Sequence, residues 1–195
     1  MRIGILGGTF SPVHFGHIKM AEAVLESKVV DKVLFMVAGN APHKKIETAS
    51  GRHRYNMVKL ICDGERFDCS DVELNKETNY TFDTLTEISA QNPENEYYFI
   101  TGADMFLSLP KWYRADELME KFKFIAIDRE GSFAKKKEQF EKVCFLADAT
   151  VLNIKTPDIS STMVRQLIKN GGDVSGLIPK VVEDYIKENG LYQGE

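Results

Sequence analysis

The chain has 195 residues, of which 43 % are hydrophobic and 28 % are charged, and its formal net charge is −4. This composition is that of a globular protein, and a chain of this size buries enough surface to fold without a disulfide framework or a structural metal. The acidic balance argues against a protein that coats nucleic acid, and no apolar run approaches the roughly 18 residues of a membrane span. We therefore expect one domain, residues 1–195, with no nucleic-acid or membrane partner.

The cysteines and histidines indicate a compartment and a reactive region. The three cysteines form no C-x-x-C pair, and the N-terminus lacks the apolar stretch of a secretory signal, so free thiols and a cytoplasmic location are expected. All four histidines lie in the first 53 residues, which marks that region as the place to look for chemistry: His14, His17, His43 and His53.

Short apolar runs alternate with helical patterns along the chain. Residues 3–6 predict a buried strand that ends at Gly7-Gly8, residues 17–26 predict a helix, and residues 33–37 predict the next strand. Further strands are predicted at 97–100, 122–127 and 151–154, and further helices at 52–62, 80–90, 160–169 and 179–189. The alternation predicts an α/β fold, a Rossmann-like, doubly wound, mainly parallel sheet with helices on both faces. Ligands of such sheets bind at the carboxyl ends of the strands.

The segment GGTFSPVHFGH, residues 7–17, is the strongest functional signal. Glycines after a strand let the backbone approach a ligand, and the helix that follows offers unsatisfied N–H groups and a positive dipole end. His14 and His17 stand where that helix begins, so the segment predicts a site for a phosphoryl group. The spacing matches neither the dinucleotide fingerprint nor the P-loop. Metal ligation stays open as an alternative, although the segment has no Cys or carboxylate to complete such a site, and so does simple packing of the histidines.

A second motif, ISSTMVR, occupies residues 159–165. Ser160 is suited to cap a helix, and Arg165 is spaced to reach back to Ser161 and Thr162 at the same helix end. Alone, this pattern is also that of an ordinary capped helix with a surface arginine. Together with the first motif it predicts a second phosphate clamp in a C-terminal helical portion, residues 159–195.

The two motifs together resemble the nucleotidyltransferase superfamily that carries the H-x-G-H signature. Within it, the chain is most similar to the bacterial nicotinate-nucleotide adenylyltransferases. The similarity extends through AGNAPHK (38–44), YTFDTL (80–85), GAD (102–104), LPKW (109–112) and the C-terminal segment 181–192. The family usually has Asp where this chain has Ser11, and Pro where it has Ala38 and Ala41.

The resemblance implies that the 5′-phosphate of nicotinate mononucleotide attacks the α-phosphorus of ATP, with Mg²⁺ held mainly by the phosphates and not by protein ligands. It gives catalytic roles to His14, His17 and Arg165. It implies that ATP is bound by Gly8, Thr9, Phe10, His14, Gly16, His17, Ser161, Thr162 and Arg165. For the mononucleotide it implies contacts with His43, Lys44, Thr81, Phe82, Asp104 and Trp112.

Each of these assignments has a simpler competitor. Asp104 is also explained as a solvated surface residue and Trp112 as a packing residue. Arg52 and Arg54 are placed to support the basic loop before them, and are equally well explained as solvated helix residues. Backbone N–H groups near Thr81 suit a carboxylate better than an amide, which favours nicotinate over nicotinamide mononucleotide.

Two rival functions remain. Another adenylyltransferase of the superfamily would use nicotinamide mononucleotide or phosphopantetheine as acceptor, and a regulatory module would bind nucleotide without catalysis, an idea motivated by Ser11. Whether the chain forms a homo-oligomer is left open.

The expected ligands are anions, although the chain is itself acidic. The sequence resolves this locally, because its candidate donors of positive charge gather at one edge of the sheet: His14, His17, His43, Lys44 and Arg165.

Overall fold

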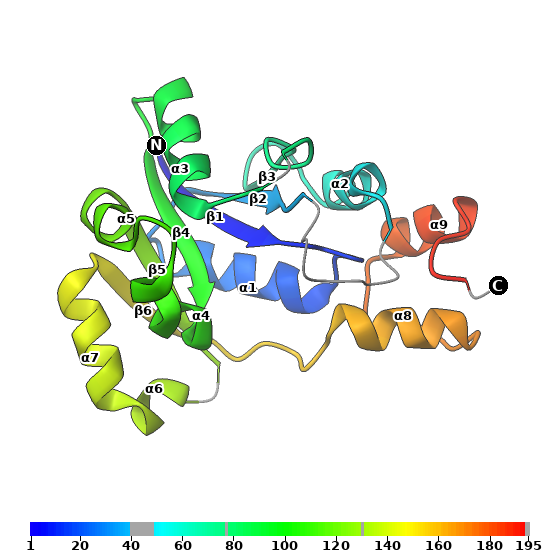
Figure 1. Cartoon of the computed structure of the whole chain (residues 1–195). Helices are drawn as coiled ribbons and strands as arrows, with labels where there is room; N and C mark the ends of the chain where they lie inside the picture. Colours follow the sequence, from blue (N-terminus) through cyan, green and yellow to red (C-terminus); the bar gives the residue numbers. More distant parts are fainter. Residues whose placement is uncertain (40–48, 77, 130, 194–195) are drawn as a thin grey trace.

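In the computed structural model, six strands form a single parallel sheet (Figure 1), and the structure describes residues 1–39, 49–76, 78–129 and 131–193. The strand order is β3-β2-β1-β4-β5-β6, with every neighbouring pair parallel. This confirms the Rossmann-like, doubly wound sheet. The strands are β1 (Arg2–Gly8), β2 (Lys32–Val37), β3 (Phe67–Ser70), β4 (Glu96–Gly102), β5 (Lys123–Asp128) and β6 (Ala149–Asn153).

The strand order reverses between β1 and β4, and ligands of doubly wound sheets bind in the crevice at such a point. β1 is the central strand and is buried on both faces. Ile5 points into one apolar cluster and Leu6 into the other. The loop that follows β1 therefore starts from a rigid position.

Helices cover both faces of the sheet, each with its own apolar cluster. One cluster joins the sheet to α1, α2, α8 and α9, and the other joins it to α3, α4, α5 and α7. The bounds are α1 (Phe15–Glu26), α2 (Gly51–Lys59), α3 (Thr81–Gln91), α4 (Ala103–Ser108), the 3₁₀ helix η1 (Leu109–Lys111), α5 (Ala115–Lys121), α6 (Ser132–Lys135), α7 (Lys137–Leu146), α8 (Ser161–Lys169) and α9 (Lys180–Glu188).

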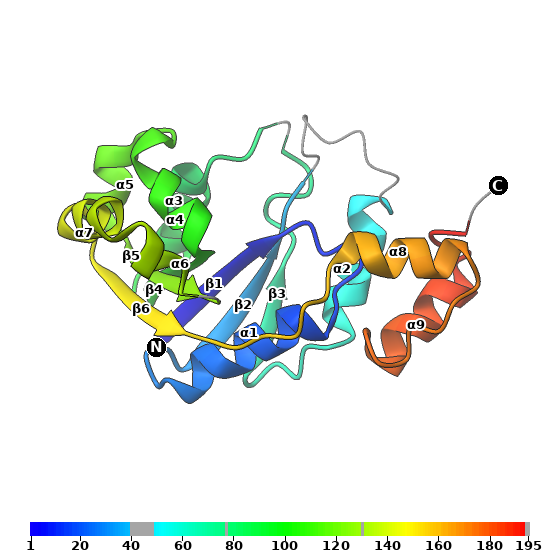
Figure 2. The ribbon, with the colours of Figure 1, turned by 90° about the horizontal axis from the view of Figure 1, so that it is seen from below.

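The C-terminal helices α8 and α9 lie side by side at the end of the molecule away from α5 and α7 (Figure 2). Val164 of α8 and Val182 of α9 are fully buried in the same cluster as Val13 from the loop after β1. This packing brings the second sequence motif against the first, although about 150 residues separate them. Among the described residues, no helix is both long and apolar enough to cross a membrane.

Four features of the fold differ from the sequence prediction. Residues 132–146, for which no helix was predicted, fold into α6 and α7. β3 was not predicted, because it has four residues and buries only Phe67 fully, which leaves no apolar run to recognise. The segment between β4 and β5 folds into three short helical pieces, α4, η1 and α5. The first helix begins two residues early, at Phe15, with His14 as its N-cap.

Candidate functional site

The loop after β1 is built around Phe10. Its φ of +49° turns the chain sharply, and its ring is 2 % exposed, with an edge-on contact to His17 at 5.0 Å between ring centroids. The ring lies so close to Gly8 that a Cβ there would come within 2.7 Å of it. The packing of the loop therefore requires glycine at position 8. The Phe10 ring is packed in the core and has no exposed face for a substrate to contact.

Donors from two other helices hold the carbonyl oxygens of this loop. Arg54 of α2 donates to the Thr9 carbonyl at 2.8 Å, and Arg165 of α8 donates to the Ser11 carbonyl at 2.8 Å. The Ser161 hydroxyl donates to the Pro12 carbonyl at 2.9 Å. Because these carbonyl dipoles are paired with donors, an anion above the loop meets less repulsion. The two sequence motifs thus form one structure.

The histidines form a stacked pair at the start of α1. Their ring centroids are 3.7 Å apart with an angle of 26° between the planes, and the His14 backbone N–H donates to His17 Nδ1 at 3.3 Å. A Cβ on Gly16 would lie 3.0 Å from the His14 ring. The glycine of the H-x-G-H motif therefore makes room for the first histidine.

Both histidines are neutral at physiological pH. Burial lowers the pKa of His14 to about 4 and that of His17 to about 3, with further lowering by the Arg129 cation. His17 Nδ1 accepts a hydrogen bond, so its proton is on Nε2. His14 Nδ1 is buried without a partner, which also favours the Nε2–H tautomer, since an unpaired buried donor would be left otherwise. In the chain without ligand, burial therefore favours neutral N–H donors over the cations that the sequence analysis expected.

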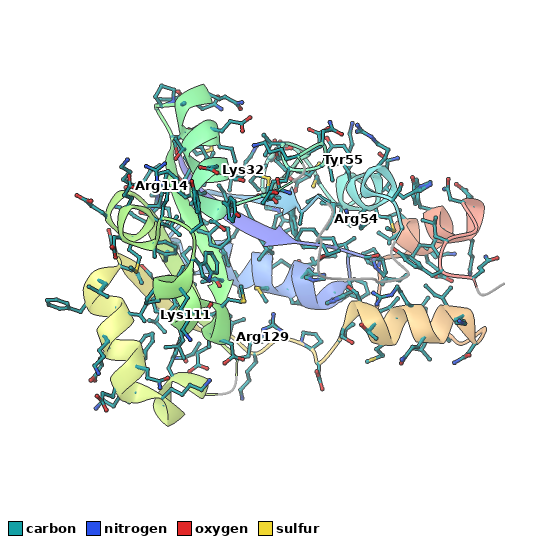
Figure 3. The ribbon with its side chains drawn as sticks, in the orientation of Figure 1. Lys32, Arg54, Tyr55, Lys111, Arg114 and Arg129 are labelled. Carbon is teal, nitrogen blue, oxygen red and sulfur yellow. The ribbon has the colours of Figure 1, made fainter. Side chains whose placement is uncertain are left out.

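Arginines supply the positive charge instead. Arg165 also donates to the Thr162 hydroxyl at 3.2 Å, and Ser160 caps α8 by accepting from the Met163 N–H at 3.1 Å, both as the sequence predicted. Arg129 was missed. It follows β5 directly, reaches toward α1 with its guanidinium 4.0 Å from the Met20 sulfur, and acts electrostatically on both histidines (Figure 3). Its place just after a parallel strand is the signal that would have found it.

A cavity of about 490 Å³ opens next to the loop that follows β1, and residues of β1, β2 and β4 contribute to its lining. Gly7 and Gly8 line it on one side, and Thr81 and Trp112 line it on another. The Trp112 indole N–H donates to Ser108 Oγ at 2.9 Å, and Phe99 contacts the indole edge-on at 5.9 Å, so the ring is held in a defined orientation.

The N-terminus of α3 forms part of the cavity wall. The helix begins with Thr81 and Phe82. Its first hydrogen bond runs from the Thr84 N–H to the Tyr80 carbonyl. The Phe82 side chain is buried in the core, with the Arg114 guanidinium 4.0 Å from its ring centroid. Phe82 does not line the cavity, so of these two predicted residues the structure brings only Thr81 to it.

The other predicted mononucleotide residues are not gathered around this cavity. The Asp104 side chain is 86 % exposed, forms an ion pair with Lys136 at 3.1 Å and is absent from the cavity lining. His43 and Lys44 lie outside the described residues.

Arg54 is the functional residue whose environment the sequence described least well. It is 3 % exposed, which excludes the interpretation that it is a solvated helix residue. Arg52, on the same helix, is exposed and lies 3.5 Å from Asp71. Gly39, whose carbonyl Arg54 contacts at 3.3 Å, is fixed as glycine because a Cβ there would lie 2.3 Å from the Glu73 carbonyl oxygen.

No group of three or more His, Cys, Asp or Glu residues able to hold a metal exists in the part of the chain that the structure describes. The site offers many N–H donors, which suit phosphate oxygens. In the tautomers inferred above, His14 and His17 present Nε2–H and not a lone pair.

Residues 5–167 match the cytidylyltransferase-like family model. A protein of Synechococcus sp. (strain JA-3-3Ab), named "Probable nicotinate-nucleotide adenylyltransferase", is 42 % identical over 98 % of this chain and 94 % of its own length. A Clostridium tetani protein of the same name is 38 % identical, over 97 % and 98 % of the two chains. The chain belongs to the nicotinate-nucleotide adenylyltransferase family.

The solved structures agree with this family at the level of the fold. The nicotinic acid mononucleotide adenylyltransferase of Plasmodium falciparum, complexed with NaAD, has a TM-score of 0.77 and 21 % identity, and the comparison covers 98 % and 97 % of the two chains. The same Plasmodium enzyme complexed with APC gives a TM-score of 0.74. The nucleotidyltransferase fold is therefore shared at low sequence identity.

Proposed function

We propose that this chain transfers the adenylyl group of ATP to nicotinate mononucleotide, giving nicotinate adenine dinucleotide and pyrophosphate in NAD biosynthesis. An oxygen of the mononucleotide 5′-phosphate forms the new bond to the α-phosphorus, and the bond from that phosphorus to the bridging oxygen of pyrophosphate breaks. No protein nucleophile takes part, so the protein contributes position and charge stabilisation.

The triphosphate of ATP lies over the loop after β1 in this proposal. His14 and His17 donate from Nε2–H, and Arg165 and Arg129 supply cationic charge to the phosphates that leave. Neutral imidazole donors inside a buried loop stabilise developing charge on oxygen without having to lose a proton. This role does not depend on protonation of either ring.

The mononucleotide occupies the 490 Å³ cavity. The Trp112 indole provides a face for the pyridine ring, and a cationic pyridinium gains from lying over such a face. The backbone N–H groups at the start of α3, at Thr81 and Phe82, receive the carboxylate, because they can donate but not accept. Asp104, which is exposed beside the strand ends, is proposed to meet the ribose.

One observation carries the proposal. Gly8 belongs both to the proposed phosphate loop, residues 7–17, and to the lining of the cavity, so the two sites are continuous. A molecule whose ring fills the cavity can bring its phosphate to the loop where the triphosphate lies. Transfer between two bound nucleotides requires this adjacency, whereas a module that only binds ATP has no use for the cavity.

Mg²⁺ enters as part of the substrate MgATP. The three cysteines, Cys62, Cys69 and Cys144, are free thiols, which is compatible with the cytoplasmic location that we propose.

An acceptor panel tests the proposal. Purified protein is incubated with ATP, Mg²⁺ and one acceptor at a time, namely nicotinate mononucleotide, nicotinamide mononucleotide or phosphopantetheine, and pyrophosphate is measured. We expect release with nicotinate mononucleotide and much less with the other two. Release with phosphopantetheine would favour the rival enzyme, and no release with any acceptor would favour the binding module.

A further inference from the structure

We propose that Arg54 is a positioning residue that sets the distance between the two substrate sites, and this inference rests on the function proposed above. Arg54 lies on α2 near the end of β1 (Figure 3). Its guanidinium bridges the segments after β1 and β2, to which the proposed function assigns different substrates. It touches neither substrate in this account, so its effect passes through the backbone it holds.

The contacts of Arg54 divide between the two sites. On the ATP side, Nη1 donates to the Thr9 carbonyl at 2.8 Å. On the mononucleotide side, Nη1 donates to the Ala38 carbonyl at 2.7 Å and Nη2 to the Gly39 carbonyl at 3.3 Å. Ala38 and Gly39 both line the cavity. The β1–β2 ladder already pairs Gly8 with Val37, and the Ala38 N–H donates to the Gly8 carbonyl at 2.9 Å. Arg54 extends this connection past the ladder, to the carbonyl groups of Thr9 and Gly39.

The position of Arg54 is itself tightly determined. Nε donates to the Ala49 carbonyl at 3.2 Å, just before α2, and the side chain is buried. Its described hydrogen bonds all go to backbone carbonyl oxygens, so a buried cation is held by dipoles. Desolvation lowers the pKa of the guanidinium, although an arginine stays protonated at neutral pH. Such an arrangement costs desolvation energy, which indicates that the bridge has a role beyond packing.

Lysine cannot replace this bridge. A guanidinium is a planar fork whose donors reach several oxygens at fixed angles, whereas an ammonium is a compact charge on a flexible stem. Lysine keeps the charge but cannot hold Thr9 and Gly39 at one spacing. Because each substrate still meets its own loop, binding of either alone should survive. What is lost is the alignment of attacking oxygen and phosphorus, and a misplacement of about 1 Å costs roughly 10²-fold in rate.

The test compares Arg54→Lys with Arg52→Lys, the matched control on the exposed side of the same helix. Dissociation constants are measured for each substrate separately, with the fluorescence of Trp112, the single tryptophan, reporting on the mononucleotide. We expect Arg54→Lys to lower kcat by about 10- to 100-fold while each dissociation constant changes less than about threefold. The control should match the wild type.

Two results would overturn the inference. One is a kcat of Arg54→Lys close to that of the wild type. The other is a rise in both dissociation constants with kcat retained, which would make Arg54 a binding or purely structural residue. Far-ultraviolet circular dichroism and the urea midpoint confirm that the variant is folded, and Arg54→Gln, which keeps an amide donor without charge, serves if the lysine variant is not. A wild-type protein that releases no pyrophosphate would refute the proposed function instead, so the two failures are distinguishable.

Discussion

Acidification from pH 7.5 to pH 5 should destabilise this protein through His14, which is buried, and His17, which is half-buried. The folded state holds the pKa of His14 at about 4 and that of His17 at about 3, against an ordinary value of 6.5. Between these values the unfolded chain binds protons that the folded chain does not, so stability falls as pH decreases below 6.5. Above pH 6.5 the stability is not reduced by these histidines.

The size of the effect follows from the same pKa values. At pH 5 an unfolded histidine with a pKa of 6.5 is almost fully protonated and a folded ring with a pKa of 4 or below is mostly neutral. Each ring then costs about 2 kcal/mol relative to pH 7.5. The pair accounts for about 4 kcal/mol, which is a large share of the stability of a typical domain.

Urea unfolding at pH 7.5, 6.5, 5.5 and 5.0 measures this directly, with Trp112 fluorescence as the signal. The double variant His14→Gln/His17→Gln is the reference, because carboxylates titrate in both proteins and cancel in the difference. A pH dependence of the wild type equal to that of the double variant would refute the reasoning, since the histidines would then not be buried in the neutral form.

Three further predictions follow from the site. His17→Ala should lower kcat by about 10²- to 10³-fold, the usual effect of removing one transition-state donor, and an unchanged kcat would contradict the role of His17. Because neutral rings donate, the wild-type kcat should be flat from pH 8 to pH 6. Trp112→Ala should weaken mononucleotide binding, measured by calorimetry, and leave ATP affinity near normal; an equal loss for ATP would make Trp112 a packing residue. Gly39→Ala should lower the free energy of unfolding by about 1–3 kcal/mol, because its Cβ would overlap the Glu73 carbonyl, whereas Gly102→Ala, with open space around it, should not.

The fold was largely accessible from the sequence because its inner strands, such as β2 and β5, are mostly buried. Runs such as residues 33–37 have no polar interruption, and the helices between them show a different period. β3 and the segment from α4 to α5 were missed because they are short and half-exposed, so neither burial nor period marks them. Helices α6 and α7 were missed as well, and α7 buries only Val143. The two motifs were expected to act together, and the structure places the loop after β1 against α8.

The electrostatics of the site could not be predicted in the same way. Residue identity indicates that His17 can be charged, but only burial shows that it is not. Arg52 and Arg54 are two residues apart on one helix and look alike in sequence, yet one is exposed and the other bridges two loops, because helical geometry turns them to different sides. Such differences depend on tertiary packing. The roles of the individual site residues all stay predictions. Asp104 does not line the cavity, and His43 and Lys44 lie outside the described residues.

We propose above that the cavity and the loop after β1 together select the acid form of a pyridine mononucleotide for adenylyl transfer. The most direct measurement is kcat/KM for nicotinate and for nicotinamide mononucleotide, at saturating MgATP, with the dinucleotide product identified by mass. The account predicts nicotinate adenine dinucleotide as the preferred product, with a kcat/KM for the acid at least about tenfold above that for the amide, since backbone N–H donors pair with a carboxylate and not with an amide NH₂. Equal values for the two acceptors would contradict the assigned role of the α3 N-terminus, and the absence of any dinucleotide would contradict the proposed function itself.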